Sequence, residues 1–110
     1  MRVVISEEAE RDLETVYVYI GEDNPEAAEH FARATSEALN QLHRHPELGP
    51  RPGFPTRHKR LRFWVVSGFH NYLIFYEITK EELKIIRVLH GARDLRRLLG
   101  KRQLRDAEGS

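Results

Sequence analysis

The sequence predicts an α+β domain in which a short first strand and a helical hairpin pack on one face of an antiparallel sheet, with a short C-terminal helix. Between residues 9 and 42 apolar side chains recur every three or four positions, the period of amphipathic helices. Between residues 61 and 90 three runs rich in aromatic and β-branched residues are typical of strands. A chain of 110 residues suits one core, so we expect a single domain over residues 1–100 and a basic, flexible tail over residues 101–110.

Capping residues predict where the helices begin and end. Residues 3–5 form the first strand, and Ser6 is a favourable N-cap. Asn24 before Pro25 marks a second start, because such side chains accept hydrogen bonds from free amides. Pro46 blocks continuation of the second helix. We expect the buried stripes at Ala9, Leu13, Val16, Tyr17 and Ile20, and at Ala28, Phe31, Thr35, Ala38, Leu39 and Leu42, with Glu10, Arg11, Asp12 and Glu14 facing water.

Residues 46–59 hold four prolines and two glycines, which predict a loop. Residues 61–66 form the next strand and residues 67–70 a turn. The two strands of a hairpin follow, joined by the polar connection 79–82. Gly91 permits a bend after the last strand, and Asp94 can cap a short helix that carries Leu95, Leu98 and Leu99.

The register of the strands decides which side chains share a face. If the turns close symmetrically, Val66 lies opposite Asn71 and Ile78 lies opposite Leu83. The helices then cover Leu61, Phe63, Val65, Tyr72, Ile74, Tyr76, Ile78, Leu83, Ile85 and Leu89. The other face carries Trp64, Leu73, Phe75, Ile86 and Val88 within a frame of Arg60, Arg62, Glu77, Lys84 and His90. We expect this second, uncovered face to bind a partner peptide as an added helix or strand.

Arg87 is the one charged residue among the apolar side chains predicted to face the helices. Burying a guanidinium without a partner costs several kcal/mol in rough terms. Two interpretations stay open, an ion pair with an acidic residue of the first helix and an anion-binding site.

Two further groups are candidates for chemistry. Residues 57–62 (RHKRLR) concentrate basic side chains that suit either phosphates or an acidic protein partner. Histidine side chains titrate near neutrality, so His90 could act as a general acid or base, with Glu77 as a complementary group. The register places Glu77 opposite Lys84 and His90 at the other end of the hairpin, so a turn-stabilising role for His90 is the alternative.

Composition excludes several classes of protein. The chain has no cysteine and no HExxH-like spacing, so we expect no disulfide, metal or other cofactor. No apolar run is long enough to span a bilayer, and we expect a cytoplasmic protein without a signal peptide or membrane anchor. Residues 1–45 carry 4 Lys/Arg against 10 Asp/Glu, a charge of −6, and residues 46–110 carry 14 against 7, a charge of +7. A basic working surface or complementarity between the halves explains this split.

Several segments resemble toxins of the ParE/RelE superfamily. They are residues 72–76 (YLIFY), 86–95 (IRVLHGARDL), 24–28 (NPEAA) and 46–49 (PELG), and they are most similar to the ParE branch. The resemblance implies the ParE/RelE fold and the toxin of a type II toxin–antitoxin system. It also implies a cognate ParD-like antitoxin whose C-terminal segment binds the toxin in a hetero-oligomer. ParE-branch toxins poison DNA gyrase without a known catalytic site.

Two alternatives come with the resemblance. One is a RelE-like, ribosome-dependent mRNA endoribonuclease, for which the candidate catalytic residues are Lys59, Arg60, Arg62, Arg87 and His90. The match to that branch is incomplete, because Leu73–Phe75 stand where ribonucleases tend to place an arginine. The other is an inactivated toxin fold kept as a binding module. For antitoxin or target binding the candidates are Arg60, Arg62, Trp64, Phe75, Arg87, His90, Arg93, Arg96 and Arg97.

Overall fold

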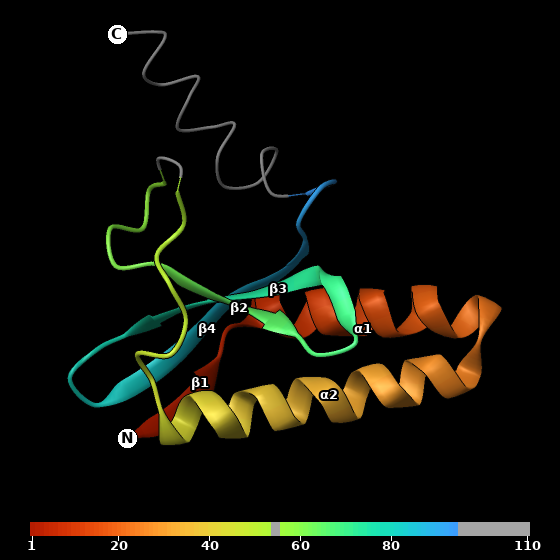
Figure 1. The fold of residues 1–110 in the computed structure, drawn as a ribbon, viewed down its shortest axis with the longest axis horizontal. Helices are drawn as coiled ribbons and strands as arrows, with labels where there is room; N and C mark the ends of the chain where they lie inside the picture. Colours follow the sequence, from red (N-terminus) through yellow and green to blue (C-terminus); the bar gives the residue numbers. More distant parts are fainter. Residues whose placement is uncertain (54–55, 95–110) are drawn as a thin grey trace, which may run out of the picture.

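The computed structural model describes residues 1–53 and 56–94, in which two helices pack on one face of a four-stranded sheet (Figure 1). The elements in chain order are β1 (Arg2–Ile5), α1 (Glu7–Asp23), α2 (Pro25–Arg44), β2 (Arg62–Val66), β3 (Phe69–Ile78) and β4 (Glu82–His90). The predicted α+β class is confirmed. The expected C-terminal helix and the basic tail over residues 101–110 lie outside the described residues.

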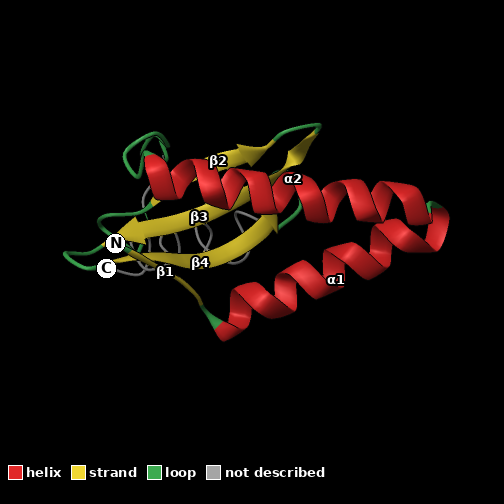
Figure 2. Ribbon diagram, turned by 90° about the horizontal axis from the view of Figure 1, so that it is seen from below, coloured by secondary structure: helices red, strands yellow, loops and turns green. Residues whose placement is uncertain are grey.

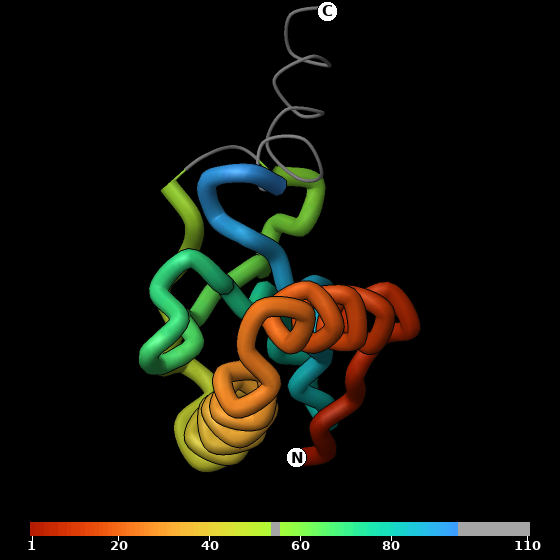
Figure 3. The backbone as a smooth tube through the Cα atoms, turned by 90° about the vertical axis from the view of Figure 1, so that its right-hand side faces the viewer, coloured from red at the N-terminus to blue at the C-terminus, as the bar shows by residue number. Residues whose placement is uncertain are grey.

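The sheet brings the first and last strands together. Its strand order is β1-β4-β3-β2. β1 runs parallel to β4, whereas the pairs β4–β3 and β3–β2 are antiparallel, so the sheet is mixed. β1 and β2 are its two edges. Figure 3 looks nearly along the helices and shows α1 and α2 side by side.

The helices begin where the capping residues predict. Ser6 Oγ accepts a hydrogen bond from the backbone N–H of Ala9 at 3.0 Å. Asn24 Oδ1 accepts from the N–H of Ala27 at 3.1 Å, with Pro25 in the first turn. Each cap satisfies an amide that the helix itself leaves free, which stabilises a helix by about 1 kcal/mol. No helix in the described ranges is both long and apolar enough to cross a membrane.

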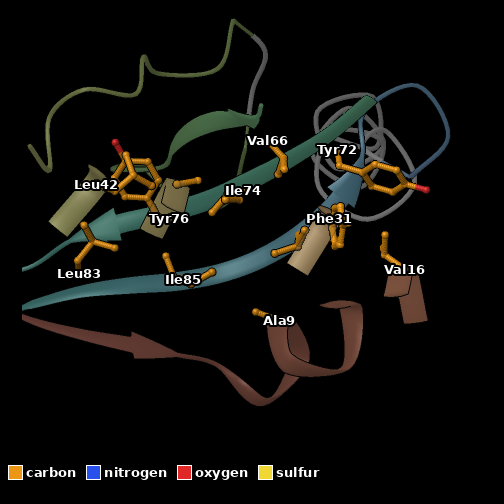
Figure 4. Close-up of a cluster of buried hydrophobic side chains, with 12 residues drawn as sticks. Ala9, Val16, Phe31, Leu42, Val66, Tyr72, Ile74, Tyr76, Leu83 and Ile85 are labelled. Atoms are coloured by element: carbon orange, nitrogen blue, oxygen red, sulfur yellow. The ribbon is translucent and has the colours of Figure 1, made fainter. Parts of the chain in front are cut away.

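The main core lies between the helices and the sheet (Figure 4). Leu42 of α2 lies beside Tyr76 of β3, and these two side chains, like Phe31 and Ile74, are at most 1% exposed. The ring of Phe31 meets that of Tyr72 edge-on, with centroids 5.5 Å apart. Full burial of one such side chain contributes roughly 1.5–3 kcal/mol, so this layer is the main source of stability.

The hairpin of β3 and β4 begins in the predicted register and then shifts. Ile78 lies opposite Leu83, as expected. A bulge follows, because Tyr76 pairs with Ile85 whereas Phe75 pairs with Arg87. One extra residue in β4 reverses the faces beyond it. Val88 consequently joins the helix-side core, and Leu89 does not, contrary to the prediction for both residues.

The register of β2 against β3 was predicted wrongly. Val66 pairs with Phe69 instead of Asn71, because the chain reverses at Ser67 and Gly68 alone. Gly68 has a φ of 83°, in the left-handed region that favours glycine and permits this tight turn. An irregularity between Val65 and Val66 then leaves the rest of β2 shifted by one residue from the predicted register, which turns each of its side chains to the opposite face.

The shift changes the composition of both faces of the sheet. Trp64 packs against the helix-side core, and Val65 is 36% exposed. Leu61 and Phe63 move to the other face, where Leu61 forms a second buried cluster with Phe75 and Leu89. These three side chains are at most 2% exposed. The expectation of an uncovered apolar floor on that face is therefore wrong.

Candidate interaction surfaces

Arg87 is held by Asp12 of α1. Its Nε and Nη2 donate to the two carboxylate oxygens of Asp12 at 2.8 Å each, which makes a bidentate pair. Glu8 adds a longer contact of 3.6 Å. The side chains of Arg87 and Asp12 are only 18% and 13% exposed. The predicted ion pair with the first helix is confirmed, and the expectation that Asp12 faces water is wrong.

Asp12 also completes the edge of the sheet. β1 pairs with β4 as far as Ile5 and Ile85, and α1 then begins. Further along β4, Asp12 Oδ2 accepts from the backbone N–H of Val88 at 2.9 Å. The hydrogen bonds to Asp12 raise the pKa of Arg87, although burial acts in the opposite direction. The pair therefore docks α1 on β4, and it occupies the donors that an external anion would need.

Arg62 attaches the proline-rich loop to the sheet. Its Nη1 donates to the carbonyl oxygen of Gly49 at 2.7 Å and to that of Glu47 at 3.2 Å. From the next strand, the hydroxyl of Tyr76 donates to the carbonyl oxygen of Pro46 at 2.7 Å. The same hydroxyl accepts from the N–H of Gly49 at 2.9 Å. Arg62 and Tyr76 thus form a clamp that holds the loop.

His90 stabilises the turn after β4. Its Nδ1 accepts from the backbone N–H of Arg93 at 3.1 Å. Its own backbone N–H donates to Asp94 Oδ2 at 3.2 Å. The imidazole packs edge-on against Tyr72, with ring centroids 5.3 Å apart. Because Nδ1 accepts from within the turn, the turn-stabilising interpretation of His90 is confirmed.

The candidate acid and base lie apart. Glu77 pairs with Lys84, as predicted, and its carboxylate lies 3.9 Å from His58 Nδ1. His90 instead pairs with Tyr72, five ladder positions away along the hairpin. In the part of the chain that the structure describes, no three histidine, aspartate or glutamate side chains gather closely enough to hold a metal ion.

The other basic candidates are on the surface. Lys59 and Arg60 are exposed in a turn just before β2. Arg93 is also exposed, and its guanidinium lies 5.7 Å from the ring centroid of Tyr19, within the range of a cation–π contact. Arg96 and Arg97 lie outside the described residues.

The two aromatic candidates for partner binding lie on opposite faces of the sheet. Trp64 is half-buried beside the helix-side core. Phe75 is 0% exposed in the second cluster. A partner can therefore contact the exposed part of Trp64, but Phe75 offers it no surface in this conformation.

The sequence analysis missed a surface between the two helices. Tyr17, expected in the core, is 38% exposed, and its hydroxyl donates to the carboxylate of Glu29. That carboxylate raises the pKa of Tyr17. Val18 and Tyr19 are 52% and 57% exposed. Three consecutive large side chains span most of a helical turn and cannot all face one core, so the sequence itself carried this information.

The fold and its tightly held charged residues define a small α+β domain built around a helical hairpin and a mixed sheet. Comparison with known proteins identifies it further. The family model of the ParE toxin of type II toxin–antitoxin systems, parDE, matches residues 3–95. The chain therefore belongs to the ParE toxin family.

A solved structure agrees with this assignment at the level of the fold. It is the chromosomal ParDE toxin–antitoxin system from P. aeruginosa, which contains a chain similar to this one with a TM-score of 0.67. The two are 19% identical, and the similarity covers 82% of this chain and 95% of that chain. A search of curated proteins gave no match.

Proposed function

We propose that this ParE toxin inhibits DNA gyrase by binding and without catalysing a reaction of its own. The observation that carries the proposal is that Arg62, Arg87 and His90 each have a structural task. Arg62 holds the loop, Arg87 docks α1, and His90 stabilises a turn. These are three of the five residues that the ribonuclease alternative requires.

Phosphoryl-transfer chemistry argues in the same direction. Cleavage of RNA needs positive groups placed where negative charge develops, and this electrostatic stabilisation is usually the largest catalytic contribution. A guanidinium whose donors already face a carboxylate cannot turn to a phosphate without leaving Asp12 unpaired. Lys59 and Arg60 remain exposed and could contact a phosphate. Glu77 and His90, however, lie too far apart along the hairpin to act together as a general acid and a general base.

We further propose that a ParD-like antitoxin binds the toxin in a hetero-oligomer in the cytoplasm. The similar P. aeruginosa structure is a ParDE system, which supports a partner of that kind. Residues 46–110 carry a net charge of +7, which suits an acidic partner segment. Arg60 and Arg93 are the exposed, described candidates for contacts with it.

Supercoiling by purified gyrase tests the proposal. Relaxed plasmid, ATP and gyrase are titrated with the folded toxin alone and then with toxin premixed with its antitoxin. The expected result is loss of supercoiling with accumulation of linear DNA, relieved by the antitoxin. Unimpaired supercoiling at large toxin excess would contradict it, particularly if the same preparation cuts mRNA on ribosomes in a codon-phased pattern.

A further inference from the structure

The helices α1 and α2 are joined at one end and diverge from there toward β1 (Figure 2). Two adjoining pockets lie between them, one of about 350 Å³ and one, nearer the connection, of about 510 Å³. Tyr17 lines both pockets, so we treat them together as the interhelix groove. The groove is lined by side chains of the hairpin, most of them apolar, and by Ile5 of β1 at its wider end.

The wider end of the interhelix groove has an apolar lining with one unusual polar atom. Leu13 and Leu39 are half-buried there, and Phe31 forms part of the lining. Thr35 also lines this pocket and is 5% exposed, yet its Oγ1 has no hydrogen-bond partner among the residues that the structure describes. Buried polar atoms are nearly always paired, and Oγ1 itself is closed to solvent, so a partner in the groove can reach this hydroxyl once the Thr35 side chain rotates toward the pocket.

At the end near the helix connection, small residues leave a depression in the groove. Gly21 and Ala28 approach each other closely, since a Cβ on Gly21 would lie 3.4 Å from the Cβ of Ala28. Small residues here leave a depression bordered by Val18 and Pro25. The exposed flank of Tyr17 connects this depression to the wider end.

Charge defines the kind of partner that fits. The charged residues that line the two pockets are all glutamates, namely Glu14, Glu22, Glu26 and Glu29. The whole segment 1–45 carries a net charge of −6. An apolar floor with an acidic rim suits a segment that has an apolar stripe flanked by lysine or arginine.

We propose that the interhelix groove binds a basic amphipathic helix of the toxin's protein target. This inference rests on the proposed function only for the identity of that target. The helix lays its apolar stripe against Leu13 and Leu39, directs its cations to the glutamate rim, and supplies one polar side chain to Thr35 Oγ1. A helix fits better than a strand, because both walls of the groove are helices and offer no free sheet edge.

A synthetic peptide tests the groove without gyrase. The probe is an amphipathic helix of leucine and lysine with one central glutamine, titrated into ¹⁵N-labelled toxin. We expect the shifted amides to cluster around Val18, Gly21 and Thr35. The double variant Glu22→Lys/Glu26→Lys should weaken binding about tenfold, as expected for two rim charge pairs, whereas Glu37→Lys, elsewhere on α2, should change it less than about twofold. Shifts elsewhere, or equal affinity for the double variant, would overturn the proposal.

A second pair of variants isolates the hydroxyl. Thr35→Ser keeps the oxygen and should retain peptide affinity, whereas Thr35→Val removes it and should lower affinity severalfold in a protein with unchanged spectra elsewhere. Equal peptide affinity of the two variants would contradict a contact between the peptide and the Thr35 hydroxyl.

Gyrase and the antitoxin then identify the natural occupant. We expect Glu22→Lys/Glu26→Lys to require about tenfold more toxin for half-inhibition of gyrase and to bind the antitoxin normally. Loss of antitoxin binding with normal gyrase inhibition would assign the groove to the antitoxin and overturn the assignment to the target. If wild-type toxin leaves gyrase active, the proposed function fails, and the peptide result still decides whether the groove binds basic helices.

Discussion

At the scale of single residues, Asp12 has more structural tasks than its exposed neighbours. One carboxylate binds the guanidinium of Arg87 and the amide of Val88. It therefore satisfies a charge and a sheet-edge donor together. Glu8 reaches the same guanidinium from a side chain that is 62% exposed, so its contribution is screened by water.

Replacing Asp12 should therefore cost far more than replacing Glu8. We expect Asp12→Ala to lower the free energy of unfolding by about 3 kcal/mol, because it leaves a largely buried guanidinium and an amide without a partner. Asp12→Asn should cost less, since its amide oxygen can still accept. Glu8→Ala, the control, should cost less than about 0.5 kcal/mol. Urea denaturation of the three variants measures the differences, and similar values for Asp12→Ala and Glu8→Ala would contradict this account.

Replacing Thr35 should stabilise the fold, in contrast to replacing Asp12. Its hydroxyl is buried without a partner among the described residues, and leaving such a group unpaired costs roughly 1–3 kcal/mol. Thr35→Val keeps the shape and removes the hydroxyl, so we expect the free energy of unfolding to rise by about 1 kcal/mol. Thermal denaturation checks the change. A destabilised Thr35→Val protein would mean that the hydroxyl already has a partner in solution.

At the scale of elements, the loop that follows α2 depends on a close contact with the sheet. A Cβ on Gly49 would lie 2.3 Å from the carbonyl oxygen of Phe63 and 2.7 Å from the hydroxyl oxygen of Tyr76. The backbone of the loop therefore packs this closely against Phe63 of β2 and Tyr76 of β3 only because residue 49 has no side chain. Gly53, in the same loop, has nothing within 4 Å of such an atom.

This contrast predicts the effect of two matched substitutions. Gly49→Ala should lower the free energy of unfolding by about 1–3 kcal/mol, because it forces the loop away from the Arg62 and Tyr76 clamp. Gly53→Ala should leave stability unchanged or raise it slightly by restricting the unfolded chain. Chemical denaturation compares them, and equal stability of the two variants would mean that the loop is not held as described.

The clamp also predicts a pH dependence. Burial raises the pKa of Tyr76, and the hydrogen bond from Gly49 only partly opposes that effect. The folded state therefore holds the phenolic proton more tightly than the unfolded chain, whose tyrosine pKa is about 10. The associated stability is complete below that pH and declines as the pH rises above it toward the folded-state pKa. Tyr76→Phe should lack this decline, which denaturant titrations near neutrality and at alkaline pH can measure; parallel curves would contradict it.

The elements also show how far the sequence could predict the structure. Caps at Ser6 and Asn24 act through neighbouring amides, so local residues were enough to place both helices. The register of a strand depends on its pairing with the neighbouring strands along its whole length. The extra residue of β4 and the tight turn at Gly68 have no unambiguous local sequence pattern, so the sequence did not predict them. The sequence predicted that Arg87 pairs with an acidic residue of the first helix, because a buried charge requires a partner. That this residue is Asp12 follows only from the folded structure.

At the scale of the whole molecule, charge is divided between two layers. The segment that ends with the helical hairpin carries −6, and the remainder carries +7. The glutamates of the interhelix groove lie in the first segment, and Lys59, Arg60 and Arg93 lie in the second. Two surfaces of opposite sign suit two partners of opposite charge, which fits the proposed target and the proposed antitoxin.

The candidate site residues differ in how well the sequence could predict them. Arg60 and Arg93 are exposed as a binding role requires, and their basic character was visible in composition alone. Trp64 depended on a register that the structure corrects, whereas Phe75 lies on the predicted face but is fully buried there. The interhelix groove arises from the divergence of two helices, which apolar periodicity does not encode.

The stoichiometry of gyrase inhibition tests the central claim, that the toxin acts by binding rather than by catalysis. Gyrase is held in molar excess over the toxin, and its residual supercoiling rate is followed over time. A toxin that acts by binding should inhibit a fixed fraction of the gyrase, set by the molar ratio and constant once equilibrium is reached. A continuing loss of gyrase activity at substoichiometric toxin, or many mRNA cuts per toxin molecule on ribosomes, would contradict the claim and show turnover.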